Sequence, residues 1–266
     1  MTMIVPTRIK IVFFAFTLLR LKASALYLFN YTGLKQILKH NVKIANEISG
    51  KPISIIGNAP TAKLIDTSAL TDTKIFCVNR CHDLMFQLKI TPDFHVIIDP
   101  KIANGTWDLE LIDRSLKMFP EIKIILDISW YKFERFKKYR NNVRVFWIYI
   151  RKFTPIFLHR NKFQITGILD TYYVAETCCS IAISSNVTEI NLFGIEGDGI
   201  CSLLLEKDSH YNGKDPDVDM QPNTVADAFF DNALFVYIWY AYTDLCNEKR
   251  ITIHNHTPRG IIRMMN

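Results

Sequence analysis

The chain has 266 residues, of which 49% are hydrophobic, and it carries a formal net charge of +6. This composition excludes a disordered or low-complexity chain and provides enough apolar material for one large folded domain. Residues 1–51 hold eight basic side chains and one acidic side chain, so the other 215 residues carry about −1. Because nucleic-acid-binding proteins spread basic residues over their folded domain, this distribution predicts that nucleic acid is not a partner.

The first fifty residues combine an apolar run at 11–19 with flanking basic residues, among them Arg8, Lys10, Arg20 and Lys22. Such a run is too short to span a bilayer, which requires about 20 apolar residues. Basic and apolar side chains interleaved in this way are typical of a helix lying on an anionic membrane surface, and an ordinary helix packed on the domain is the alternative. The sequence therefore predicts a membrane-associating helical segment at 1–50, and a cytoplasmic protein held peripherally at the inner membrane.

From residue 52 onward, short apolar runs alternate with amphipathic stretches. The runs are rich in β-branched and aromatic residues and are bounded by polar or turn residues, which is typical of strands. Strands are expected at 53–57, 74–79, 94–99, 122–128, 143–150, 189–195 and 251–254, and helices at 107–118, 168–185 and 224–247. Strands of this kind alternating with helices predict an α/β fold with a mostly parallel sheet covered on both faces, formed by one domain at 51–266.

Polar residues with turn chemistry follow five of the expected strands. In a parallel sheet the carboxyl ends of the strands meet at one edge, where ligands bind at a switch in strand order. Together the five ends are more informative than any one of them, because a single polar residue at a strand end is usually only a cap. The residues are Gly57-Asn58, Asn79-Arg80, Asp99-Pro100, 196–199 and 254–258.

The stretch Gly57-Asn58-Ala59-Pro60-Thr61 ends the first expected strand. Glycine lets the backbone approach a ligand closely, and an asparagine side chain both donates and accepts hydrogen bonds. The N–H groups at the start of the following helix-like stretch favour an anion. The stretch is neither a Walker loop nor the glycine fingerprint of NAD sites.

The sequence contains no pattern of residues with the spacing of a known metal site. The pair Cys77 and Cys81 has no second pair at zinc spacing, and the cysteines are expected to be small buried side chains in a reducing compartment. The acidic stretch 215–219 lacks the glycine and glutamate of a calcium loop. His254 and His256 are expected to shape a pocket. We therefore expect neither a metal nor a cofactor.

Six short motifs follow one another between residues 52 and 262: IIGNAPT, CVNR, IIDP, INLFGIEG, DSHYNG and HNHTPRG. In this order they resemble the bacterial CMP-sialic-acid-dependent sialyltransferases that decorate lipooligosaccharide, and the wider relatives that begin with a Gly-x-Gly-Pro-Ser type of turn. The resemblance implies a single Rossmann-like domain with a small mobile lid, here around 200–222. It also implies metal-independent, inverting transfer of sialic acid from CMP-sialic acid to a surface-glycan acceptor.

The resemblance also assigns roles to individual residues. His210 matches the catalytic histidine that takes the proton of the acceptor hydroxyl, and Tyr211 beside it is a second catalytic candidate. Asn58 and Asn79 match asparagines that contact the donor nucleotide. The full set of expected donor-binding residues is Gly57, Asn58, Pro60, Thr61, Asn79, Asp99, Thr166, Gly167, Gly194, Glu196, Thr257 and Pro258.

The sequence departs from the family pattern at three places. The family's Thr-Ser-Gly appears here as Ile165-Thr166-Gly167. Asp99 stands where the family has an asparagine, and a carboxylate beside a phosphate is repulsive. The tyrosines that contact the leaving phosphate in the family are missing after Gly194-Ile195-Glu196. Stabilisation of the leaving group must then come from Tyr211, Arg259 or the amides of Thr166-Gly167.

Two other functions stay open on the sequence alone. Some wider relatives transfer pyrophosphoryl groups to pterins, which would require Mg²⁺ held by carboxylates such as Asp99 and Glu196. The third function is a non-catalytic membrane-surface protein that binds nucleotide sugars. A CMP-activated donor, a glycan or glycolipid acceptor and the membrane surface are the expected partners, and the sequence leaves room for a homo-oligomer.

Overall fold

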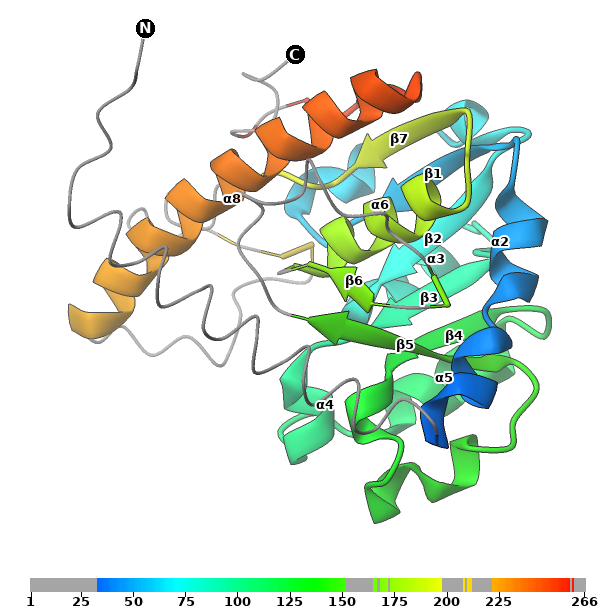
Figure 1. The fold of residues 1–266 in the computed structure, drawn as a ribbon. Helices are drawn as coiled ribbons and strands as arrows, with labels where there is room; N and C mark the ends of the chain where they lie inside the picture. Colours follow the sequence, from blue (N-terminus) through cyan, green and yellow to red (C-terminus); the bar gives the residue numbers. More distant parts are fainter. Residues whose placement is uncertain are drawn as a thin grey trace, which may run out of the picture.

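The computed structural model describes residues 33–151, 165–166, 168–171, 173–197, 208, 210–211, 222–258 and 260. Their centre is an eight-stranded sheet in the order β6-β5-β4-β3-β2-β1-β7-β8 (Figure 1). All seven pairings between neighbouring strands are parallel. The strands are β1 (Pro52–Ile56), β2 (Lys74–Val78), β3 (Phe94–Ile97), β4 (Lys123–Asp127), β5 (Val145–Arg151), β6 (Ile168–Asp170), β7 (Glu189–Phe193) and β8 (Thr252–Asn255).

Helices and short 3₁₀ turns connect these strands. Residues 33–39 are helical as well. The α-helices are α2 (Val42–Ile48), α3 (His82–Gln87), α4 (Pro100–Asn104), α5 (Glu110–Met118), α6 (Val174–Ser184) and α8 (Pro222–Lys249). The 3₁₀ turns are η1 (Pro60–Leu64), η2 (Thr67–Leu70), η3 (Asn79–Cys81), η4 (Ile128–Trp130) and η5 (Glu134–Tyr139).

The order in which the chain adds strands to the sheet reverses between β1 and β7. From β1 the chain runs outward through β2, β3, β4 and β5 to β6, and then returns to place β7 and β8 on the other side of β1. Parallel crossovers are right-handed, so this reversal puts the connecting helices of the two halves on opposite faces of the sheet. The predicted Rossmann-like α/β fold is confirmed, and its topological switch point lies at β1 and β7.

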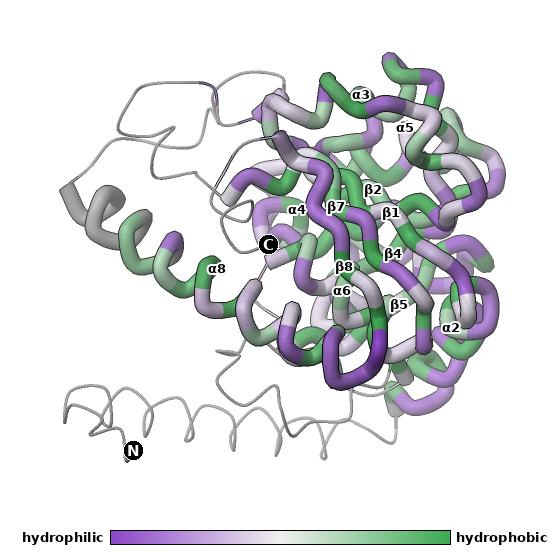
Figure 2. Tube along the Cα trace, turned by 90° about the horizontal axis from the view of Figure 1, so that it is seen from above, coloured by the Kyte–Doolittle hydropathy of each residue, from purple (hydrophilic) through white to green (hydrophobic). Residues whose placement is uncertain are grey.

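Helix α6 is buried on nearly all sides. Residues Ala175 to Ile183 are all buried, and the helix packs across β1, β2 and β3. Helix α8 packs on β8 and α6 and extends well beyond the sheet (Figures 1 and 2). No helix in the described part of the chain is both long enough and apolar enough to cross a bilayer.

One predicted element is wrong. A helix is expected over 168–185, but Ile168–Asp170 forms strand β6, which pairs with β5, and the helix begins only at Val174. Three residues are too few to show the alternation that marks a strand. The pairing with β5 therefore decides their conformation.

The described part of the N-terminal segment packs into the domain. Leu38, Ile44 and Ile48 are fully buried, and Asn41 Nδ2 donates to the carbonyl oxygens of Trp147 at 2.9 Å and Ile165 at 3.0 Å. Residues 33–50 therefore contribute to the core of the sheet domain. The predicted membrane-associating segment otherwise lies outside the described residues, and so does most of the predicted lid.

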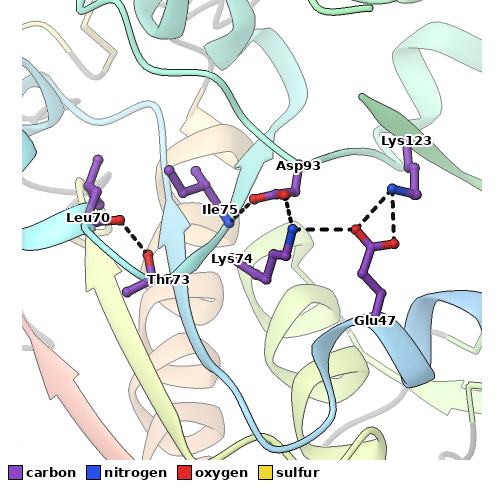
Figure 3. A network of polar contacts seen from close by, with 7 residues as sticks. All are labelled: Glu47, Leu70, Thr73, Lys74, Ile75, Asp93 and Lys123. Carbon is purple, nitrogen blue, oxygen red and sulfur yellow. Dashed lines mark hydrogen bonds and ion pairs between the residues drawn. The ribbon is translucent and has the colours of Figure 1, made fainter. Parts of the chain in front are cut away.

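An ion network fastens α2 to the amino ends of three strands (Figure 3). Glu47 on α2 lies 2.9 Å from Lys123 Nζ and 3.6 Å from Lys74 Nζ, and Lys74 also pairs with Asp93. Asp93 accepts the backbone N–H of Ile75 at 2.9 Å. Burial lowers the pKa of Lys74, but the hydrogen bond and charge of Asp93 and the charge of Glu47 outweigh it and leave that pKa raised. The network lies at the edge of the sheet opposite to the switch point.

Candidate functional site

Two glycines bring the strand ends at the switch point close together. A Cβ atom on Gly57 would lie 2.3 Å from the carbonyl oxygen of Gly194, and one on Gly194 would lie 2.5 Å from Ala62 Cβ. Gly194 also has a φ of 60°, in the left-handed region that favours glycine. The turn after β7 therefore fills the space beside Gly57, and no open approach for a ligand is left there, contrary to the reason expected from the sequence.

Glu196 joins the turn after β7 to the turn after β1. Its Oε1 accepts the backbone N–H of Thr61 at 3.0 Å, and the side chain is buried. Pro60 starts the 3₁₀ turn η1, so Glu196 occupies the anion position that the sequence predicts at this start. Thr257 completes the arrangement, because its Oγ1 accepts the N–H of Ile195 at 3.2 Å. The ends of β1, β7 and β8 thus form one connected rim.

His210 and Tyr211 lie over the ends of β1 and β2. The N–H of Tyr211 donates to the carbonyl oxygen of Asn58 at 2.7 Å, and its hydroxyl donates to the carbonyl oxygen of Arg80 at 3.1 Å. Burial raises the pKa of Tyr211 to about 12, so the hydroxyl stays protonated and acts as a donor. The half-buried His210 precedes this anchor directly. The structure therefore brings His210, Tyr211 and Asn58 together with the end of β2, and the rim extends to that strand end.

Unsatisfied polar atoms gather around this rim. The side chain of Asn58 makes no hydrogen bond within the described part of the chain, and Thr61 Oγ1 and Asn79 Oδ1 are buried there without a partner. Asn79 also has a φ of 44°, which is uncommon for a residue other than glycine. Buried polar atoms are nearly always hydrogen-bonded in native proteins, and strained residues concentrate at functional sites. These atoms mark the rim as a candidate ligand site.

A buried histidine holds the strained end of β2 in place. His95 Nδ1 lies 2.8 Å from Ser115 Oγ, and Nε2 bonds to the carbonyl oxygen of Asn79. A carbonyl only accepts, so Nε2 carries the proton and Nδ1 accepts from the serine hydroxyl. Burial first, and then the charge of nearby His82, lower the pKa of His95 to about 3. The ring is therefore neutral, with both nitrogens committed.

Acidification is expected to destabilise the fold through His95. An unfolded histidine binds a proton near its ordinary pKa of 6.5, whereas the folded ring resists protonation down to about 3. The stabilisation is thus present above pH 6.5 and is lost as the pH falls, by about 2 kcal/mol between pH 6.5 and 5. Urea unfolding of the parent and of His95→Gln at several pH values measures this difference. Equal acid sensitivity of the two proteins would show that His95 is not the group responsible.

A cavity of about 370 Å³ lies beside Tyr211, between the end of β2 and the start of α5. Its walls include Arg80, His82, Trp107 and Arg114. His82 is 3% exposed, and neither ring nitrogen makes a hydrogen bond, although Nε2 lies 3.4 Å from Asp83 Oδ1. The sequence placed Arg80 at a strand end but missed His82 and Trp107. Only the packing of α5 against the sheet brings these side chains together.

The remaining predicted residues lie elsewhere or have other partners. Asp99 caps α4 by accepting the N–H of Lys101 at 3.0 Å. Thr166 precedes β6, which pairs with Tyr149–Arg151 at the carboxyl end of β5 and lies five strand spacings, about 24 Å, from β1. The structure does not bring it to the rim. Pro258 is exposed beside Thr257. Gly167 and Arg259 lie outside the described residues.

The carboxylates proposed for Mg²⁺ do not fit one ion. Asp99 follows β3 and Glu196 follows β7, and these strands are three spacings apart, about 14 Å. Two ligands of one Mg²⁺ lie within about 4 Å of each other. Both carboxylates also accept backbone N–H groups. Within the described residues, no group of three or more histidine, cysteine or acidic side chains has the arrangement of a metal site.

The buried cysteines have no sign of reactivity. Cys77, Cys81, Cys178, Cys179 and Cys246 are buried and form no disulfide. Burial raises the pKa of Cys81 to about 12, so its thiol stays protonated. These five behave as the small core side chains expected from the sequence.

Among solved structures, the chain is similar at low identity to bacterial sialyltransferases. The sialyltransferase CstII from Campylobacter jejuni, in complex with CMP-3FNeuAc, is 16% identical with a TM-score of 0.47, covering 80% of this chain and 84% of that one. A complex of CstII with cytidine-5'-monophosphate is 17% identical with a TM-score of 0.45, and the match covers 81% of this chain and 84% of that one. An α-2,3-sialyltransferase from Campylobacter jejuni in its apo form is 14% identical with a TM-score of 0.41, and the match covers 79% of this chain and 80% of that one. No curated protein matches the chain.

A family model extends over most of the sheet. It matches residues 30–197 and is described as "6-hydroxymethylpterin diphosphokinase MptE-like". The matched region starts before α2 and reaches Glu196, so it includes β1 to β7 and the rim residues Asn58 and Asn79. Because this match covers well over half of the 266 residues, the chain belongs to the MptE-like family.

Proposed function

We propose that the protein is an inverting glycosyltransferase that moves an acidic sugar, most simply sialic acid, from a CMP-activated donor to a glycan acceptor. The observation that carries the proposal is the anchoring of Tyr211 to Asn58 and Arg80. This anchor holds His210 beside the ends of β1 and β2, and β1 borders the topological switch point, where α/β sheets bind nucleotides. The unsatisfied atoms of Thr61 and Asn79 at the same rim support a polar ligand there.

In this proposal His210 acts as the general base. Its imidazole takes the proton of the acceptor hydroxyl, whose electron pair forms the new glycosidic bond. The bond from the sugar to the phosphate breaks on the opposite side, and CMP leaves with that electron pair. Neutral imidazole is a competent base near pH 7 because its ordinary pKa is about 6.5.

Diphosphoryl transfer is the second candidate, and family membership favours it. The family description names a diphosphokinase, so a nucleoside triphosphate would replace the CMP-sugar at the rim. Mg²⁺ would then neutralise the transferred phosphates. The wide separation of Asp99 and Glu196 argues against these two residues as joint ligands.

Ligand binding and metal dependence separate the two candidates. In a thermal-shift screen, CMP and CMP-N-acetylneuraminate at 100 times their dissociation constants are expected to raise Tm by roughly 5–10 °C. ATP is expected to have little effect, and turnover of the CMP-sugar should persist in EDTA. Stabilisation by ATP alone, or complete inhibition of transfer by EDTA, would instead support the diphosphokinase.

We also propose that the basic segment at 1–50 holds the protein on an anionic bilayer near lipid-linked acceptors. The charge excess of this segment supports the proposal. Residues 33–50 belong to the core, so a chain beginning at residue 33 is the proper truncation. Sedimentation of the full and truncated chains with anionic vesicles tests this part, and equal sedimentation of both would refute it.

A further inference from the structure

We propose that the cavity between the end of β2 and the start of α5 is a subsite for an oxyanion carried by the sugar substrate, with Arg80 as the residue that binds it. This inference rests on the proposed function and adds the substrate class that the cavity selects. Its starting point is the volume of about 370 Å³, which lies in the range of small-molecule sites.

Arg80 is held at the wall of this cavity by an aromatic ring. Its guanidinium carbon lies 5.6 Å from the centroid of Trp107, a cation–π distance. Within the described residues no carboxylate pairs with this guanidinium. By contrast, Arg114 in the same wall lies 2.6 Å from Asp83 and is already paired. Arg80 is therefore the lining cation that is available to an incoming anion.

The buried wall of the cavity contains a histidine ring with an unsatisfied nitrogen. His82 is 3% exposed and lines the cavity; its Nε2 lies 3.4 Å from Asp83 Oδ1, and its Nδ1 has no polar partner within the described residues. A ring nitrogen left without a hydrogen bond at this depth indicates a ligand group that would complete it. The other lining carboxylates, Asp108 and Glu110, are exposed, so water and salt screen their repulsion of an anion.

Tyr211 places the cavity next to the proposed chemistry. Its backbone bonds to Asn58 at the nucleotide rim, while its side chain lines the cavity and bonds to the carbonyl oxygen of Arg80. A sugar attached to a nucleotide at the rim, or an acceptor approaching His210, would therefore extend toward Arg80. A bidentate carboxylate or phosphate matches the planar guanidinium.

The test compares Arg80→Gln and Arg80→Lys with Lys101→Gln in the full-length protein. Lys101 is the matched control, because its Nζ lies 5.6 Å from the same Trp107 ring but the residue does not line the cavity. Titration calorimetry measures binding of CMP and of CMP-3-fluoro-N-acetylneuraminate. Kinetics compare a neutral acceptor, lactose, with a sialylated one, 3'-sialyllactose.

If Arg80 binds the carboxylate of the donor, Arg80→Gln should lower the affinity for the fluorinated donor at least about tenfold and leave the affinity for CMP unchanged. If it binds an acidic acceptor, KM should rise at least about tenfold for sialyllactose and stay unchanged for lactose. Arg80→Lys should fall between Arg80→Gln and the parent, and Lys101→Gln should match the parent.

Two results would overturn the inference. One is an Arg80→Gln protein that matches the parent with every ligand, and the other is an equal loss of affinity for CMP and for the fluorinated donor. A parent protein that binds neither nucleotide would instead refute the proposed function itself. The two failures are therefore distinguishable in one set of measurements.

Discussion

Replacing His210 with alanine is expected to lower kcat for glycosyl transfer about 100- to 10,000-fold, the usual contribution of a general base. Donor affinity should remain, because the contacts that join the rim are made by Thr61, Glu196 and Thr257. The backbone N–H of Tyr211 that fixes this stretch to Asn58 is also unaffected by the change. Steady-state turnover, together with calorimetric titration of CMP, measures the two quantities separately.

His254→Ala provides the control for this prediction. His254 is an exposed histidine on β8, so its removal should leave turnover close to that of the parent. Unchanged turnover in His210→Ala would rule out His210 as the base. A loss of CMP binding along with turnover would assign the residue to donor binding instead.

Gly57→Ala is expected to cost about 2–3 kcal/mol of unfolding free energy, in the upper range for overpacked sites. The new Cβ would lie 2.3 Å from the carbonyl oxygen of Gly194, which is backbone and cannot rotate away. That carbonyl also accepts from Ala59 N–H at 3.2 Å, while Gly57 N–H donates to Phe193 at 2.8 Å. Relief of the clash therefore separates β1 from β7 and moves the rim.

Thermal unfolding measures the effect of Gly57→Ala, with an expected fall in Tm of roughly 4–12 °C. Gly33→Ala is the matched control, because nothing lies within 4 Å of the Cβ that it would add. Its position in a helical stretch predicts a change of no more than about 1 kcal/mol. A Gly57→Ala protein as stable as the control would show that β7 yields easily at this point.

The sheet was predictable where the local pattern is strong. Strands β1, β2, β3 and β7 are mostly apolar and are followed within three residues by polar side chains, so both their existence and their carboxyl ends follow from the sequence. Strand β6 was not predictable, because its three residues acquire strand geometry only by pairing with β5. The order of strands was accessible only through the general rule for parallel sheets.

The candidate site divides in the same way. Asn58, Asn79 and Glu196 stand at strand ends and could be selected from the sequence alone. The partner of Glu196 could not, because the N–H of Thr61 reaches it across 135 positions of the chain. Thr166 illustrates the opposite error. A three-residue motif match does not determine beside which strand of the sheet a residue lies, and β6 is five strands away from β1.

His82 and Trp107 show what the sequence leaves hidden. One follows β2 and the other precedes α5, and they line one cavity because the connections after neighbouring strands pack side by side. A signal existed at His95, since a histidine within an otherwise apolar strand requires buried partners. The identity of those partners, Ser115 and Asn79, depends on the tertiary structure.

The network of Glu47, Lys74, Asp93 and Lys123 has a consequence for how such a protein can change. It holds helix α2 and the strands together at the amino ends of the strands. The residues assigned to recognition lie at the carboxyl ends, roughly 15 Å away along strands of about five residues. Loops at the carboxyl ends of the strands can therefore be exchanged without disturbing the ion network. Substrate preference and mechanical integrity are thereby free to evolve separately in this scaffold.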